Sequence, residues 1–309
     1  MRTGNTGDIT IAYPDEVVAM FARNPIVIKG FTGTSVVMTV TDENGKVAQD
    51  KRAPFGNECF FDLAYYLQSL FDTSALGKVD YESRTRVMSD VYNVELSFYV
   101  GTTSVGTFSF SLCGIWAAVL DDSNEKVKMF TGYPFSVCVR SNGAYTVDSV
   151  TLGKKGIYNI PVSGEKTVKV MNGTTVVRTI EVEESCGSGV YLRWIDRGGG
   201  YRYWLFKKGD ERTTAETDGE LLRKNTGTDY ATRRTSKKVG RSVEICAPLV
   251  DADTFTFLLG VVASPVVDMY SNGEWVSVEV DAGEITRERS EIQDFIVSVV
   301  LPEVIVQKL

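Results

Sequence analysis

Paired carboxylates are the residues of this chain whose type and spacing come closest to a reactive or metal-binding site. Asp251 and Asp253 are separated by one residue, and Asp121 and Asp122 are adjacent. A calcium-binding loop needs further oxygen ligands at fixed positions and a glycine at its sharp turn, and the sequence after Asp253 supplies neither. We interpret Asp251 as the cap of a short helix and Asp121-Asp122 as a solvated linker. We therefore predict no metal site.

Acid–base and nucleophilic catalysis are restricted because the chain contains no histidine. This absence removes the commonest general base, the usual Ser-His-Asp and Cys-His arrangements, and the common zinc ligands. Two carboxylates that converge in space could still cleave a glycosidic bond, which leaves a histidine-free hydrolase as a third, weaker alternative. The glycine-rich segments 187–189 and 198–200 lack the context of a nucleophile elbow or a dinucleotide fingerprint. We predict no catalytic residues, no cofactor and hence no enzyme.

Charge and cysteine usage limit the partners and the compartment. A net charge of −7 disfavours nucleic acid as a partner, because neutralisation of phosphates by Lys and Arg dominates that affinity. No segment has the pattern of a secretory signal or of a membrane-spanning helix. The five cysteines are widely spaced and include no C-x-x-C pair. We expect a soluble protein that folds in a cytoplasm with reduced thiols and has no membrane partner.

Aromatic residues are concentrated in residues 190–206, on both sides of a glycine run. Two runs rich in β-branched and aromatic residues, separated by residues 197–200, predict a β-hairpin, because glycine tolerates the positive φ angles of a tight turn. Side chains alternate between the two faces of a strand, and in this hairpin neither face is cleanly polar. Such a hairpin needs its own domain on one face and another domain or a second molecule on the other, unless part of it binds a ligand.

The aromatic side chains of this hairpin have two interpretations. They could form a platform on which sugar rings stack, or they could be core and interface residues. At hairpin spacing we favour the second interpretation and take four of them as candidate interface residues: Trp194, Tyr201, Tyr203 and Trp204. A carbohydrate-binding or adhesin-like β module, with a glycan as its ligand, is therefore the alternative function.

Charge is distributed unevenly after this hairpin. Residues 207–241 are polar and net positive, and four of their basic residues are candidate interface residues: Arg233, Arg234, Lys237 and Lys238. Residues 244–303 carry many acids, including Asp251, Asp253, Asp268, Glu274, Glu279, Asp281 and Glu284. If copies lie side by side, the basic stretch of one could contact the acidic surface of the next and close a ring. A solvated loop that folds back on its own domain is the equal alternative.

Strand-like runs dominate the chain and predict a mainly β, multi-domain protein built from β-sandwich-type modules. We place the domains at residues 1–120, 121–186 and 187–309. The first is a β-sandwich-like domain with one inserted amphipathic helix. The second is a small Ig-like β domain. The third is a β domain that contains the aromatic hairpin, the polar insertion 207–241 and a short helix.

Local patterns place particular elements in these domains. Apolar residues recur at helical spacing after Asn57 and predict the amphipathic helix at residues 57–72. Asn-Gly pairs at 142–143 and 172–173 predict two hairpins in the second domain, and Asn272-Gly273 predicts another in the third. The residues after Asp251 predict the short helix, with Asp251 as its cap.

Three segments of the last third carry a resemblance to a known family: YLRWIDRGGGYRYWLF, RRTSKKVGRSVEICAPLVDADTFTFLLGVVASPVVDMY, and NGEWVSVEV with FIVSVVLPEVIVQKL. They look like tail or baseplate virion proteins, of distal-tail type, from tailed phages and prophages of gut Bacteroidales. Closer to the start of the chain, NPIVIKG and CFFDLAYYLQSLF are similar to the same group more loosely.

This resemblance implies a β-rich structural subunit of a phage tail tip or baseplate. Such a protein would self-assemble into a ring, for example a hexamer, that joins the tail tube to the distal tail components. The implied partners are copies of itself and other tail proteins. The implied location is the tail of the virion, after assembly in the cytoplasm of the host bacterium. The resemblance assigns no role to any single residue.

Overall fold

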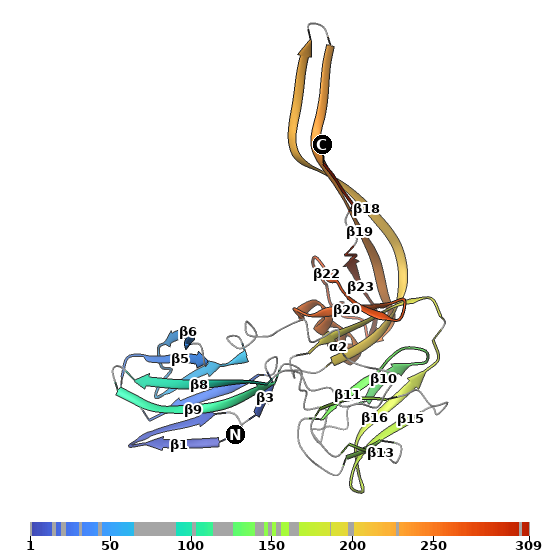
Figure 1. Cartoon of the computed structure of the whole chain (residues 1–309). Coiled ribbons are helices and arrows are strands. Elements are labelled where there is room, and N and C mark those ends of the chain that lie inside the picture. Colours follow the sequence, from blue (N-terminus) through green and yellow to red (C-terminus); the bar gives the residue numbers. More distant parts are fainter. Residues whose placement is uncertain are drawn as a thin grey trace. The chain divides into compact units, whose positions relative to one another are not determined.

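The computed structural model describes most of the chain, and it shows a mainly β protein (Figure 1). The described residues are 2–13, 17–19, 23–30, 33–42, 45–64, 91–100, 103–113, 126–139, 145–147, 150–152, 156–160, 167–185, 187–196, 201–226, 229–302 and 305–308. Contacts divide the chain into two compact units. Unit 1 comprises Met1–Glu183 with Ile195–Arg202, and unit 2 comprises Glu184–Trp194 with Tyr203–Leu309.

The first part of unit 1 contains two sheets. Their strands are β1 (Arg2–Thr6), β2 (Ile9–Tyr13), β3 (Val17–Ala19), β4 (Pro25–Lys29), β5 (Val36–Asp42), β6 (Gly45–Arg52), β7 (Glu58–Asp62), β8 (Val91–Val100) and β9 (Thr103–Cys113). One sheet has the order β1-β2-β4-β7 and the other has the order β3-β9-β8-β5-β6. In the first sheet, β4 buries Ile26 and Ile28, which alternate with less buried neighbours as a strand with one covered face requires.

The helix predicted at residues 57–72 is wrong over its first turns, because Glu58–Asp62 form strand β7. This strand pairs antiparallel with β4 and buries Cys59 and Phe61 while Phe60 stays exposed. Period-two burial of Cys59, Phe61 and Leu63 therefore overrides the helical spacing of the same segment. The backbone becomes helical only at Ala64, and residues 65–72 of the prediction lie outside the described residues.

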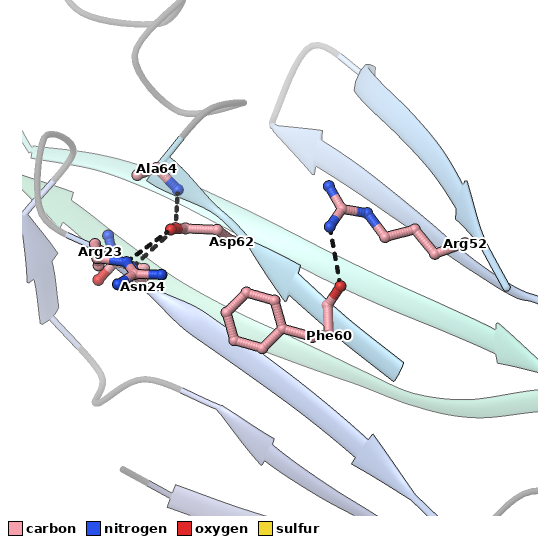
Figure 2. Close-up of polar contacts among 6 residues, drawn as sticks. All are labelled: Arg23, Asn24, Arg52, Phe60, Asp62 and Ala64. Atoms are coloured by element: carbon pink, nitrogen blue, oxygen red, sulfur yellow. Dashed lines mark hydrogen bonds and ion pairs between the residues drawn. The ribbon is translucent and has the colours of Figure 1, made fainter. Parts of the chain in front are cut away.

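A carboxylate marks the end of β7 (Figure 2). Asp62 Oδ1 accepts hydrogen bonds from the backbone N–H groups of Asn24 and Ala64, at 3.0 and 3.1 Å. The Arg23 guanidinium lies 3.7 Å from the other carboxylate oxygen. The bond from Ala64 is a local Asx turn. The bond from Asn24 is long-range, and it holds the start of β4 against the end of β7.

Residues 126–183 form a separate group of strands in unit 1. These are β10 (Lys126–Phe130), β11 (Ser136–Val139), β12 (Tyr145–Val147), β13 (Val150–Leu152), β14 (Gly156–Asn159), β15 (Thr167–Asn172) and β16 (Thr175–Glu183). The β15–β16 hairpin around Asn172-Gly173 confirms one Asn-Gly prediction. The hairpin predicted around Asn142-Gly143 is wrong, because β11 pairs with β14 whereas β12 pairs with β13 and β15.

Unit 2 is built on one large sheet of order β21-β20-β17-β18-β19-β23-β22. Its strands are β17 (Gly189–Ile195), β18 (Tyr201–Thr226), β19 (Asp229–Asp251), β20 (Val267–Ser271), β21 (Glu274–Ser277), β22 (Glu279–Asp281), β23 (Ile292–Val300) and β24 (Ile305–Lys308). β21 and β22 are at opposite ends of this order, yet only Val278 separates them in sequence. The sheet must therefore curl on itself, and it forms a nearly closed barrel.

The short helix predicted after Asp251 is confirmed as α2 (Ala252–Ala263). Asp251 Oδ1 accepts the Thr254 backbone N–H at 2.8 Å, which satisfies one of the free donors at the helix start. Phe255, Leu258 and Val261 of α2 are buried against the sheet. The hairpin predicted at Asn272-Gly273 is confirmed as well: it joins β20 to β21, with φ angles of 53° and 87° at the turn.

Candidate functional site

The aromatic hairpin predicted at residues 190–206 is confirmed as the adjacent strands β17 and β18. One face packs on α2. Trp194 and Trp204 lie 5.3 and 6.0 Å from the ring of Phe257, measured between ring centroids. Gly260 permits this contact, because a Cβ atom there would lie 2.9 Å from Trp194 Nε1.

The opposite face of the hairpin encloses a buried ion pair. Arg193 Nε donates to Asp268 Oδ2 at 2.7 Å, and the two side chains are only 1% and 8% exposed. The guanidinium lies 4.4 Å from the centroid of the Trp275 ring, at cation–π distance. The Tyr191 and Tyr203 rings stack 5.9 Å apart beside the same tryptophan. A fully satisfied polar pair inside an aromatic cluster orders the hairpin and favours one register.

Burial within the chain corrects the interface prediction for the aromatic residues. Trp194 is 1% exposed, Tyr201 4% and Tyr203 2%, and Trp204 packs partly buried against the core of unit 2. Trp194, Tyr201 and Tyr203 therefore fill the protein itself and offer no surface to a second molecule or a sugar ring, whereas Trp204 is partly exposed. On the second face Trp275 of β21 contacts Tyr191, Tyr203 and Arg193, a contact that the sequence pattern could not distinguish from a partner.

Residues 207–226 and 229–241 form the most distinctive feature of unit 2, which we call the arm. Here β18 and β19 run on as an antiparallel pair far beyond the rest of the barrel sheet (Figure 1). The 26 residues of β18 correspond to about 85 Å of strand. Of the two alternatives for this insertion, the solvated loop that folds back on its own domain is therefore wrong, because the segment consists of two regularly paired strands.

The arm carries all four basic candidate residues on β19. Arg233 and Arg234 are opposite Leu222 and Leu221 of β18. Lys237 and Lys238 are exposed, and in the part of the chain that the structure describes neither forms an ion pair. On the other edge of β19, residues Ser236–Val239 pair with β24, so a third strand braces the arm at this level.

Two irregularities shape the arm. The register of β18 and β19 shifts between Lys208 and Glu211 and again between Asp218 and Leu221. At the second shift Gly219 has φ 82°, and a Cβ atom there would lie 2.3 Å from Thr235 Oγ1. Such bulges increase the local twist of a hairpin and keep its edges from pairing indiscriminately.

The base of the arm is held by charged side chains. Glu211 accepts from Lys208 Nζ at 2.6 Å and from Arg241 Nη2 at 2.9 Å. These two hydrogen bonds, that from Lys208 foremost, lower the pKa of the Glu211 carboxyl. Arg212 contacts Glu244 across the strands at 3.1 Å. A groove of about 460 Å³ lies beside these pairs, lined in part by Arg212, Lys238 and Asp281.

The acidic surface predicted for residues 244–303 is only partly available to a partner. Asp268 is buried in the ion pair with Arg193, and Asp251 caps α2. Glu274, Glu279, Asp281 and Glu284 are exposed. The predicted surface must therefore be redrawn without Asp268.

Sequence reasoning missed an exposed apolar cluster on the outer face of β19 and β23. Leu249, Ile292 and Ile296 are 76%, 53% and 50% exposed. The signal was present in Ile292 and Ile296, which point outward while Phe295 and Val297 point into the core. The half-buried Cys246 is the register partner of Ile296. Burial raises the pKa of its thiol, and the Asp294 carboxylate adds to the rise.

The part of the chain that the structure describes contains no cluster of metal ligands. Among those residues no group of three or more Cys, Asp and Glu side chains could hold a metal ion. The same residues include no helix with the length and apolar character needed to cross a bilayer. A scan against protein-family models and a search of curated proteins both found no match for this chain.

Proposed function

We propose that this chain is a structural subunit that assembles with copies of itself, as a ring at the tail tip or baseplate of a tailed phage. The observation that carries the proposal is the arm, two long paired strands that leave the body of unit 2 (Figure 1). An isolated two-stranded hairpin is marginally stable in water. A protein gains little from extending one unless another molecule covers it.

The composition of the arm supports a protein partner. Residues 211–217 of β18 are exposed, so neither face of that strand is covered by the chain itself. The outer edge of β18 beyond Lys207 has no paired strand among the described residues. An exposed strand edge can pair with other chains, and charged side chains and bulges protect it. The arm has all three features, as expected of a segment that stays soluble until it meets its partner.

A ring is compatible with the type of contact that we propose, provided that the rotation between copies closes. An arm on one side of a subunit and its receiving surface on another give a heterologous interface, which repeats from copy to copy until the ring closes. The location in a virion tail and the joining of the tube to distal components rest on the resemblance of the last third of the sequence. They are part of the proposal on that ground.

Size-exclusion chromatography with light scattering tests this proposal. We expect a defined oligomer whose mass falls when ionic strength is raised, because exposed charges more than about 8 Å apart are screened in physiological salt. A particle that stays monomeric from micromolar to hundred-micromolar concentration would refute the proposed assembly.

Charge reversal on the arm sharpens the test. Lys237→Glu with Lys238→Glu should dissociate the oligomer by replacing two exposed positive charges with negative ones. The matched control is Lys51→Glu with Lys169→Glu, which makes the same change in net charge at exposed positions of unit 1. Equal effects of the two pairs would show that net charge, and not the arm, governs association.

The alternative function, a carbohydrate-binding module, loses the aromatic platform on which it depended. Three of its four aromatic residues are at most 4% exposed. No other feature of the described residues favours glycan binding over assembly.

A further inference from the structure

The exposed apolar cluster on β19 and β23 has features of a receiving surface. We define the apolar patch as Leu249, Ile292 and Ile296, each at least half exposed. The two isoleucines are outward positions of one strand, and Leu249 follows the register shift after Ala247 on the neighbouring strand. Large apolar side chains gathered on one solvent-facing surface are typical of sites that another protein covers.

The backbone conformation of Leu249 is a second observation that points to a function for this patch. Leu249 has φ 52°, in the left-handed region that non-glycine residues avoid. Its N–H donates to Asp294 Oδ1 at 2.8 Å, which holds the residue in that conformation. Glycine adopts this conformation without strain, and a leucine side chain that is 76% exposed adds little packing to the isolated chain. Strain retained at such a position points to a function for the side chain.

The arm offers a complementary surface at its far end. We define the arm end as residues 219–226 and 229–238. Leu222 of the arm end is 50% exposed, and Leu221, which points to the opposite face of the strand, is 37% exposed. Its charged residues are six basic and two acidic: Arg223, Lys224, Arg233, Arg234, Lys237, Lys238, Glu220 and Asp229.

Charge around the apolar patch has the opposite sign. Five acids lie within two residues of the patch residues or of their register partners, namely Glu244, Asp251, Asp253, Glu291 and Asp294, and no base does. The arm end has an excess of basic residues, and the apolar patch has acids beside it, so the two segments carry opposite charge. Opposite charge at the rim of an apolar contact steers the encounter and fixes the orientation.

The arm end cannot reach the apolar patch of its own chain. Leu222 is opposite Arg233, and Arg233 is thirteen residues of continuous strand before Cys246, the register partner of Ile296. At about 3.3 Å per residue this separation is roughly 40 Å. The two surfaces can meet only between different copies.

We infer that the arm end of one copy docks on the apolar patch of a second copy, with Leu222 and its face of the arm covering Leu249, Ile292 and Ile296. This inference rests on the proposed self-assembly and names its contact. The interface is heterologous, so each copy gives one arm end and receives another.

Cross-linking between two tagged chains tests the contact directly. One chain carries Leu222→Cys with Cys246→Ser, and the other keeps its native Cys246 beside Ile296. A short bismaleimide at pH 8.5 to 9, where more of the Cys246 thiol is ionised, should join the two tags. Replacing Cys246 by Ser in the second chain should abolish the product. Phe55→Cys, at a 94% exposed position of unit 1, is the control for random collision and should give none.

Leu249→Gly supplies a second, independent readout. Glycine removes the side chain and relieves the backbone strain, so we expect an unchanged or higher melting temperature together with self-association at least about tenfold weaker. Phe55→Gly, which removes an even more exposed apolar side chain in unit 1 (94% against 76%), should leave association unchanged.

The outcomes separate this inference from the function on which it rests. If the wild-type chain forms an oligomer but gives no Cys246 cross-link, or keeps its affinity in Leu249→Gly, the docking site is refuted while the proposed assembly stands. If the wild-type chain is monomeric at every concentration, both are refuted.

Discussion

The buried ion pair between Arg193 and Asp268 gives the sharpest test of how unit 2 is held together. Asp268→Ala would leave a guanidinium that is 1% exposed without its carboxylate. Breaking one partner of a buried pair costs about 3–5 kcal/mol, because the remaining charge is desolvated and uncompensated. Trp275 over the guanidinium keeps some favourable contact, so we expect a loss of about 3 kcal/mol in the free energy of unfolding. That is a large fraction of the roughly 5–15 kcal/mol typical of a domain.

Urea unfolding followed by tryptophan fluorescence measures this loss. Trp194, Trp204 and Trp275 all belong to unit 2, out of four tryptophans in the chain, so the signal reports mainly on the unit that contains the pair. The slope of the transition should stay constant while its midpoint falls. The exposed pair of Arg212 and Glu244 provides the control, since Arg212→Ala should cost at most about 1 kcal/mol.

A double variant separates charge from packing. Arg193→Met with Asp268→Leu replaces both partners by apolar groups and should recover most of the lost stability, as buried pairs often tolerate. A loss below about 1 kcal/mol in Asp268→Ala would contradict the reasoning, because it would mean that the guanidinium is satisfied without the carboxylate. A double variant no better than the single one would show that the shape of the pair, and not its charge, matters.

Two further predictions concern α2 and the thiol beside the apolar patch. Asp251→Ala should lower the unfolding free energy of unit 2 by about 0.5–2 kcal/mol, since it removes the acceptor of the Thr254 N–H, and the urea midpoint checks it. At pH 8, iodoacetamide should alkylate Cys246 more slowly in the folded protein than in the unfolded chain. Because the folded pKa is raised, the rate should keep increasing at a pH where that of the unfolded chain has levelled off, as mass spectrometry of the labelled peptide can follow. Equal rates in the folded and unfolded chains would contradict this prediction.

Local sequence signals predicted those elements whose turn or cap chemistry is decisive. Asn272-Gly273 specified its hairpin because both residues accept positive φ, and Asp251 specified the start of α2. Asn142-Gly143 failed, since strand pairing in that region is set by long-range contacts of β12 with β15 and of β11 with β14. Glu58–Asp62 failed for the same reason, because pairing with β4 decided between two overlapping periodicities.

Sequence patterns did not predict the two long strands of the arm. A strand is recognised by alternation between a covered and an exposed face, but residues 211–217 are exposed throughout. With no buried face, selection imposes no period of two on the side chains. The apolar patch was hidden by the opposite effect, since its isoleucines lie in a strand whose other face is core and look like ordinary strand residues.

The pairing of β24 with β19 has a consequence for the timing of folding during synthesis. Ser236–Val239 pair with Ile305–Lys308, which a ribosome adds almost seventy residues later. At about 5–20 residues per second, the hairpin waits several seconds or more without its brace. The arm therefore has only two strands at this level while residues 240–304 are being made, and its unpaired edge is covered once Ile305–Lys308 have been added.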